Sequence, residues 1–321
     1  MPAFVPLIVL SSLACLALIA APQLTFLIGI VWGMCLVLGG HFLDRSRYLL
    51  LIVLNFMLLL ILGSSAALYP MSFFGIPSLV MGLLLNQRKG YYIIQRWGML
   101  AGIIAISLFL AGAYLGAGNQ AMQGIEAQLD KYIDESMKWA QDSSLAEIYE
   151  ERGISQEELQ KNIKETARQM IHYLPALYYL ECIIGIFLIL LFSSWWCKRR
   201  GLSVLQRRPF REEIMPWQMA WVVIAGLSFW LLGRSEMSTL YYAGGNLLLV
   251  TLPITAYYGL AGIVFRVGRM KPRSRRWVIA LLIIVFLIFS LSIIFFLSLL
   301  GIFDSLIDFR KISKPKEDDE Q

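Results

Sequence analysis

The sequence predicts an all-α protein, a polytopic bundle of about nine membrane-spanning helices that carries an extracytoplasmic helical hairpin. The 321-residue chain is 58% hydrophobic and only 16% charged, with a mean hydropathy of +0.66. Soluble domains contain roughly 45–50% apolar and about 25% charged residues. The charged residues cluster between apolar runs that reach the roughly 17–25 residues a helix needs to cross the hydrocarbon core. Backbone polar groups in lipid must be satisfied within the spanning segment, so these runs are expected to be helices.

Nine apolar runs provide the predicted spans, at residues 3–21, 24–40, 48–68, 71–86, 93–116, 173–196, 216–233, 241–265 and 277–301. Only Ala21, Pro22 and Gln23 separate the first two spans, which predicts a tight turn. The fourth run is short and is interrupted by Gly75 and Pro77. The chain starts without the basic residues of a secretory signal, so the first run is expected to be a retained span.

The basic residues predict the orientation of the spans. Four loops hold 17 of the 28 Lys and Arg residues, at 45–47, 88–96, 198–211 and 266–276. In the nine-span count these loops fall on one side, and the short loops of the other side hold only Arg234. Because cytoplasmic loops are enriched in Lys and Arg, the N-terminus is expected in the cytoplasm.

The sequence leaves two alternatives for the side of the membrane on which the C-terminus lies. Nine crossings place it outside the cytoplasm, together with the basic residues Arg310, Lys311, Lys314 and Lys316. The alternative is that one weak span is re-entrant, with the fourth as the leading candidate.

Residues 117–172 form the one long polar segment. They include six basic and eleven acidic residues, and apolar side chains recur at three- and four-residue spacing, which is typical of amphipathic helices. We therefore expect an acidic helical hairpin outside the cytoplasm. The predicted organisation is a five-span bundle at 1–116, the hairpin at 117–172, a four-span bundle at 173–309 and a charged, disordered tail at 310–321.

Motifs for known chemistry are missing from the sequence. It has no phosphate-binding loop, dinucleotide fingerprint, His-Glu-x-x-His or Gly-x-Ser-x-Gly motif. Its four cysteines lie in or at the end of apolar runs, and its two histidines are far apart, so neither a metal site nor another cofactor is expected. An enzyme is therefore disfavoured. Any active transport would need a partner ATPase with its coupling subunits, or an ion gradient.

Polar residues inside spans are the first candidates for ligand binding, because they are costly in lipid and often functional. Glu181 lies in the sixth span and could bind a cationic ligand or relay a proton. The alternative is a structural role, with snorkelling to water or a pair with Arg234. Asn55 and Asn246 are further candidates, although interhelical hydrogen bonding explains each adequately.

Interrupted spans are the second indication, since transporter sites often lie where a helix is broken. Gly75 and Pro77 in the fourth span are therefore candidate binding residues, and the eighth span is also interrupted. The basic loops at 197–211 and 266–276 could attract anionic lipid headgroups. Topology explains their charge, so nucleic acid is not an expected partner.

Several short segments of the second half, in order, carry a family resemblance. They are Arg208-Pro209-Phe210-Arg211, Met215-Pro216-Trp217, Asn246, Tyr258-Gly259-Leu260-Ala261, Leu300-Gly301-Ile302-Phe303-Asp304 and Asp308-Phe309-Arg310-Lys311. In this order the chain resembles the YybS-like family of bacterial membrane proteins, over essentially its whole length. Tyr258 departs from the glutamine expected before Gly259. The resemblance implies a bacterial cytoplasmic membrane protein and supplies no catalytic residues.

The first 116 residues are also similar in style to substrate-binding subunits of energy-coupling-factor vitamin transporters, through Pro22, Gly33 and Gly39-Gly40 in a tight pair of spans. The leading functional prediction is therefore a transporter-like subunit that binds a small molecule in the lipid bilayer. The alternative is a structural, assembly or sensing protein of the cell envelope.

Overall fold

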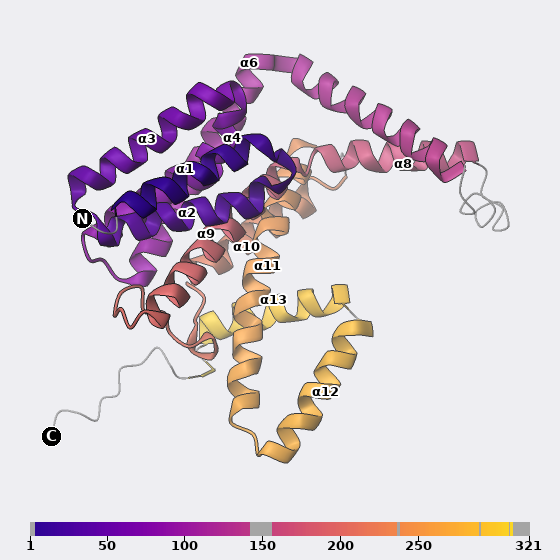
Figure 1. Ribbon diagram of the computed structural model, residues 1–321. Helices are drawn as coiled ribbons and strands as arrows, with labels where there is room; N and C mark the ends of the chain where they lie inside the picture. Colours follow the sequence, from indigo (N-terminus) through magenta and orange to yellow (C-terminus); the bar gives the residue numbers. More distant parts are fainter. Residues whose placement is uncertain (1–3, 142–155, 236–237, 289, 308, 311–321) are drawn as a thin grey trace. The chain divides into compact units, whose positions relative to one another are not determined.

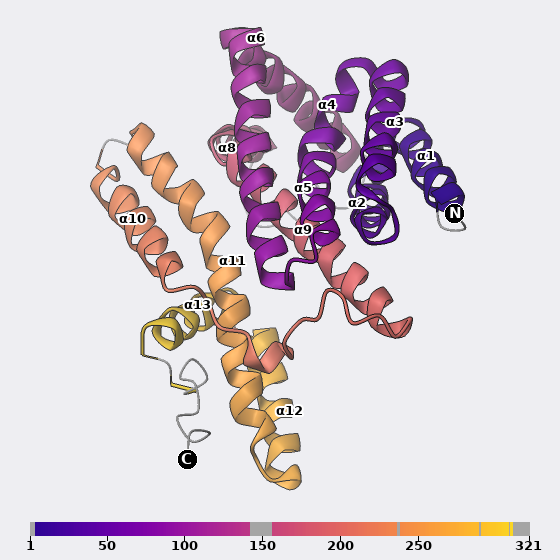
Figure 2. The ribbon, with the colours of Figure 1, turned by 90° about the vertical axis from the view of Figure 1, so that its left-hand side faces the viewer.

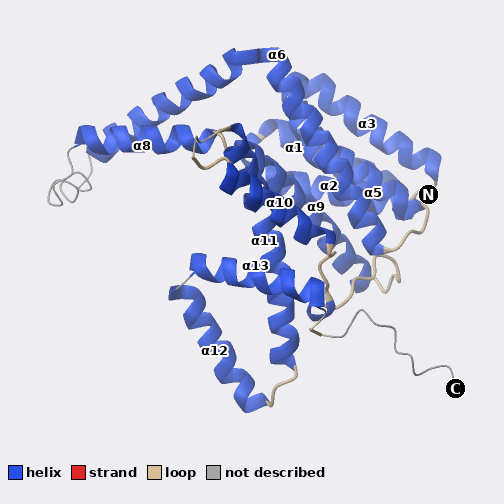
Figure 3. Ribbon diagram, turned by 180° about the vertical axis from the view of Figure 1, so that it is seen from behind, coloured by secondary structure: helices blue, strands red, loops and turns tan. Residues whose placement is uncertain are grey.

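A computed structural model describes residues 4–141, 156–235, 238–288, 290–307 and 309–310. These residues form helices joined by turns and loops, with no strand among them (Figures 1, 2 and 3). The all-α prediction is confirmed for this part of the chain. The chain divides into two compact units, Met1–Gln206 and Arg207–Gln321.

The first unit is built around α2. Its helices are α1 (Phe4–Ala20), α2 (Thr25–Phe42), α3 (Arg45–Gly63), α4 (Leu68–Pro70), α5 (Ile76–Asn86), α6 (Tyr91–Gln141), α8 (Gln156–Ile171) and α9 (Leu174–Arg199). α2 packs against α1, α5 and α9, and most of its residues from Gly29 to Gly40 are buried. Glycine makes this possible, because a Cβ at Gly40 would lie 2.1 Å from the carbonyl oxygen of Gly82 on α5. The predicted turn between the first two spans is a short 3-10 helix, Pro22–Leu24.

The predicted interruption of the fourth span is a π-helical turn at Met71–Gly75, between α4 and α5. Pro77 has no N–H, so it cannot bond the Phe73 carbonyl as residue i+4 of an α-helix would. The Cys182 thiol donates to that carbonyl instead, at 3.5 Å. Such π-turns are rare and frequently lie at functional sites.

The polar segment begins as a continuation of a span. α6 runs without interruption from Tyr91 to Gln141, and α8 follows at Gln156–Ile171. The amphipathic pattern instead predicts a separate helix for the first part of this segment. Residues 142–155, which would form the tip of the hairpin, lie outside the described residues, so the hairpin stays a prediction.

The second unit consists of α10 (Gln218–Leu232), α11 (Thr239–Gly268), α12 (Pro272–Ile288) and α13 (Ser290–Ile307). α11 packs against both α10 and α13. At the α11–α13 contact a Cβ on Gly259 would lie 1.9 Å from the carbonyl oxygen of Leu297. Small residues thus let these two backbones touch, as is common in membrane proteins. α12, by contrast, has no buried residue.

The predicted ninth span, 277–301, is not one helix. α12 ends at Ile288, α13 begins at Ser290, and the two run in different directions (Figure 1). The end of α13 is tied to the loop before α10 by Arg310. Its guanidinium donates to Asp304 Oδ2 at 2.5 and 2.8 Å, and to the backbone carbonyls of Arg211 at 2.8 Å and Glu213 at 2.6 Å.

Two boundaries therefore differ from the predicted organisation. Arg310, assigned to the disordered tail, is only 5% exposed, because it pairs with Asp304 and donates to two backbone carbonyls. Residues 311–321 lie outside the described residues. α9 packs against α2 and α6 and belongs to the first unit. The predicted second bundle, by contrast, begins at residue 173.

Five helical segments in the described ranges are long and apolar enough to cross a membrane. They are Pro22–Phe42, Arg45–Asn86, Tyr91–Gly116, Leu174–Arg199 and Thr239–Gly268. Arg45–Asn86 contains two of the predicted spans, joined through the π-turn. Shorter apolar helices lie at Val5–Ala20, Gln218–Leu232 and Ser292–Ile307. A membrane protein with several spanning helices follows, and the count of nine stays a prediction.

Candidate ligand-binding site

A cavity of about 570 Å³ lies in the first unit, where α1 ends, α2 begins and α3 ends. Its walls are Leu18, Ile19, Pro22, Thr25, Phe26, Leu59, Leu62, Gly63, Ala66, Ala67, Tyr69, Pro70 and Glu181. Most of these side chains are apolar, and Glu181 is the one ionisable group besides the Tyr69 phenol. Ligand sites commonly combine such apolar walls with a few polar groups.

Glu181 enters the cavity from the second turn of α9 and is partly buried. Its carboxylate oxygen Oε1 accepts a hydrogen bond from the Tyr69 hydroxyl. No ion pair between Glu181 and a basic residue is present in the described part of the chain. The carboxylate and the phenol therefore present one negative, hydrogen-bonding end to an apolar cavity.

Tyr69 is held by an aromatic cluster behind it. Its ring stacks on Phe73 with 4.3 Å between centroids, and Phe73 is fully buried. Phe109 of α6 and Tyr178 of α9 meet Phe73 edge-on, at 5.9 and 5.7 Å. Tyr69 was not among the residues predicted from the sequence. Its position immediately before Pro70 and the interrupted span could have indicated it.

Gly75 and Pro77, predicted as binding residues, do not line the cavity. Both are buried, and a Cβ on Gly75 would lie 2.9 Å from Trp32 and 3.0 Å from Phe56. Gly75 ends the π-turn that follows Tyr69 and Pro70, and Pro77 lies in the first turn of α5. Both are connected to the site only through the backbone.

Asn55, also predicted as a binding residue, lies in the packed interior with no exposed surface. Its Oδ1 accepts from Trp32 Nε1 at 3.0 Å and from the Cys15 thiol at 3.1 Å. Its Nδ2 donates to Ser11 Oγ at 3.0 Å and to the Leu51 carbonyl at 2.8 Å. These four partners account for the amide, and they link α1, α2 and α3.

Asn246 lies on α11 of the second unit, where its Nδ2 donates to the Tyr242 carbonyl at 2.7 Å. Of the five predicted site residues, Glu181 alone lines the cavity near α4. Glu181 lies next to Tyr69. Asn55 contacts neither of these two residues through a hydrogen bond.

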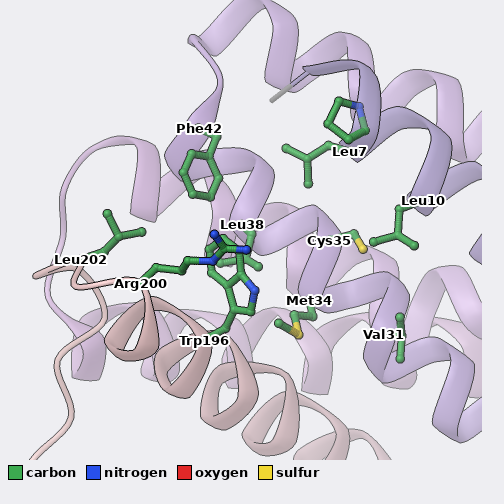
Figure 4. A pocket seen from close by; sticks show the side chains of 11 residues that line it. Leu7, Leu10, Val31, Met34, Cys35, Leu38, Phe42, Trp196, Arg200 and Leu202 are labelled. Atoms are coloured by element: carbon green, nitrogen blue, oxygen red, sulfur yellow. The ribbon is translucent and has the colours of Figure 1, made fainter. Parts of the chain in front are cut away.

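A larger cavity of about 860 Å³ lies in the first unit, at the opposite ends of α1 and α2 (Figure 4). It is lined by apolar side chains of α1 and α2, by Trp196 of α9, and by Arg200 and Leu202 just beyond that helix. Its walls contain one charged residue, Arg200.

The described helices, with several segments apolar enough to span a membrane, define an integral membrane protein. A family model described as "Predicted membrane protein (DUF2232)" matches residues 8–305, and the chain belongs to this family. No curated protein matches the chain, and no solved structure does.

Proposed function

We propose that this protein is a transporter-like membrane subunit that binds a small molecule in the cavity at Glu181. The observation that carries the proposal is the Glu181 carboxylate, hydrogen-bonded to Tyr69 in a cavity whose other walls are mostly apolar. A carboxylate is costly within a membrane-spanning helix and is commonly functional there. Asn55 supports the packing of this subunit and takes no part in binding.

The chemistry of the cavity favours a small ligand with a positively charged or strongly hydrogen-bond-donating group. Glu181 supplies the negative charge, and Phe26 and Tyr69 add aromatic surface to the walls. Aromatic rings attract ammonium groups through their quadrupole, which contributes about 0.5–2 kcal/mol.

The proposed topology places the N-terminus and the basic loops in the bacterial cytoplasm, and the polar segment around α8 outside. The cavity then opens at the extracytoplasmic ends of α1 and α3, where a ligand would arrive. On the resemblance in style of the first 116 residues to energy-coupling-factor subunits, we propose a dependence on partner ATPase and coupling subunits. An ion gradient is the other energy source.

A panel of small molecules tests ligand binding directly. The purified protein is heated with choline, a primary amine, a neutral alcohol of similar size and a carboxylate, and its apparent Tm is measured. A cation at about 100 times its Kd should stabilise the protein by about 2.7 kcal/mol. The variant Glu181→Gln should lose this response, while Glu212→Gln, at a half-buried position in the second unit, should keep it. Equal stabilisation of both variants would refute a site at Glu181.

Partner dependence needs a separate experiment. The protein is purified from its own membranes in mild detergent, and co-purifying proteins are identified by mass spectrometry. An ATPase recovered in constant ratio would support the energy-coupled form. Its repeated absence would leave an ion gradient as the energy source.

The alternative function is an envelope scaffold or sensor, and one observation favours it. α6 continues 25 residues beyond the apolar segment that ends at Gly116. A long polar helix of this kind could contact another envelope protein. Deleting residues 117–172 should abolish a scaffold function, whereas the cation response of the Glu181 cavity should survive in a subunit that still folds.

A further inference from the structure

The 860 Å³ groove at the other end of α1 and α2 combines an apolar trough with one cation (Figure 4). Along α2 the walls run from Val31 through Met34, Cys35 and Leu38 to Phe42. The eleven steps from Val31 to Phe42 rise 1.5 Å each, which gives a length of about 16 Å. This is long enough to hold much of an extended acyl chain.

The end of α9 determines the position of the one charged residue of the groove, Arg200. Gly201 has φ +69°, and the N–H of Leu202 bonds the Cys197 carbonyl at 3.0 Å while that of Gly201 bonds the Lys198 carbonyl at 3.1 Å. This is the Schellman arrangement that ends many helices. It turns the chain so that Leu202 joins the wall of the groove beside Arg200.

Arg200 is exposed at the end of α9, and its guanidinium lies over an aromatic ring. Its guanidinium carbon lies 5.4 Å from the centroid of the Trp196 ring, and Trp196 meets Phe42 edge-on at 5.7 Å. No acidic residue pairs with Arg200 in the described parts of the chain. Figure 4 shows the side chain directed toward Trp196 and Leu38, at the mouth of the trough.

The residues around Arg200 are those expected at the headgroup level of a bilayer. Tryptophan is enriched at the membrane interface, and the last residues of α9 include Trp195, Trp196, Lys198 and Arg199, followed by Arg200. An anion at Arg200 would therefore lie at headgroup level, while the apolar walls extend into the hydrocarbon region.

We propose that this groove binds one anionic phospholipid, with its phosphate headgroup at Arg200 and an acyl chain along α2. The guanidinium of Arg200, which has no acidic partner in the described residues, complements the negative charge of the phosphate. The apolar walls provide the binding surface for the acyl chain. This site is separate from the Glu181 cavity and does not depend on the function proposed there.

Native mass spectrometry of the full chain tests the site, with phosphatidylglycerol and phosphatidylcholine of identical acyl chains as probes. Wild type should retain phosphatidylglycerol about fivefold better, because a cation near the membrane surface contributes about 1 kcal/mol. Arg200→Gln should remove this preference. Arg199→Gln is the matched control, since Arg199 lies over Trp195, outside the groove, with 4.0 Å to the ring centroid.

A second variant separates the groove from surface charge. Val31→Trp fills the apolar end of the trough at a position that is 49% exposed, and it should reduce retention of both lipids. Equal retention of the two lipids by wild type would overturn the proposal. So would an equal loss in Arg199→Gln, unchanged retention in Val31→Trp, or recovery of free fatty acid in place of phospholipid.

Discussion

Asn55 shows how a polar residue within a span can belong to the interior and to no ligand. Trp32, Cys15 and Ser11 converge on one amide that has no contact with solvent. Removing the amide would leave the buried indole N–H of Trp32 without an acceptor. An unsatisfied buried donor costs about 1–3 kcal/mol.

Asn55→Ala should therefore lower the free energy of unfolding by about 1–3 kcal/mol. Thermal unfolding in detergent measures this change. Val53→Ala is the control, because Val53 lies two residues away with 54% of its side chain exposed. If both variants unfold at the same temperature, the Asn55 network contributes nothing to stability.

Tyr69→Phe isolates the hydrogen bond at the candidate site. The phenyl ring can keep its stacking on Phe73, whereas Glu181 loses the hydroxyl that orients its carboxylate. We expect cation affinity to fall about tenfold, since hydrogen bonds to charged groups contribute about 1.5–3 kcal/mol. Affinity is measured by titrating the best cation of the panel. Wild-type affinity in Tyr69→Phe would show that the phenol does not position Glu181.

Residue chemistry explains which site residues could be predicted from the sequence. Glu181 was found because an acid within an apolar run stands out by its desolvation cost. Tyr69 was not, because its role depends on a carboxylate 112 positions later in the chain. For Asn55 the sequence left two readings open, and only the positions of Trp32 and Ser11 show that its amide is fully bonded.

At the scale of helices, the contact between α11 and α13 depends on glycine. A Cβ at Gly259 would meet backbone atoms of α13, which cannot rotate away as a side chain can. Gly259→Ala should force the helices apart and cost about 1–3 kcal/mol or more. Gly262→Ala, three residues along the same helix and with no atom within 4 Å of its Cβ, should be neutral. Equal thermal stability of the two variants would contradict this close approach.

Helix prediction succeeded where apolar length and a breaking residue agreed, as at the Ala21–Gln23 turn and before Pro77. It did not find the end of α12. Between Trp277 and Leu300 the sequence has neither glycine nor proline, so nothing local indicates that α13 begins at Ser290. The contacts of α13 are distant in sequence, since it packs against Gly259 of α11 and Arg310 beyond its end donates to the Arg211 and Glu213 carbonyls.

At the scale of the whole chain, Arg310 predicts the side of the C-terminus. It donates to the backbone carbonyls of Arg211 and Glu213, so we expect the end of α13 to lie on the same membrane face as the basic loop before α10. That face is the cytoplasm in the proposed topology. The basic residues after Arg310 would then follow the positive-inside rule, and α12 with α13 would enter and leave from one side.

Single cysteines report this topology, because all four native cysteines are buried. We expect Ser313→Cys and Ser203→Cys to react with a membrane-impermeant maleimide only after lysis, and Ser235→Cys to react in intact cells. Reaction of Ser313→Cys in intact cells would place the C-terminus outside. The sequence left this question open because it contains no sign that residues 211 and 310 are close.

Carbodiimide labelling tests whether Glu181 lines a cavity that a small cation can fill. The purified protein is treated with dicyclohexylcarbodiimide with and without the panel molecules, and modification of each carboxyl is quantified by peptide mass spectrometry. Glu213, which is 4% exposed and paired with Arg207 at 2.6 Å, is the internal control. We expect Glu181 to be modified, and we expect a cation, but not the neutral alcohol, to protect it. An unmodified Glu181, or modification that no cation reduces, would rule out a cation site at this carboxylate.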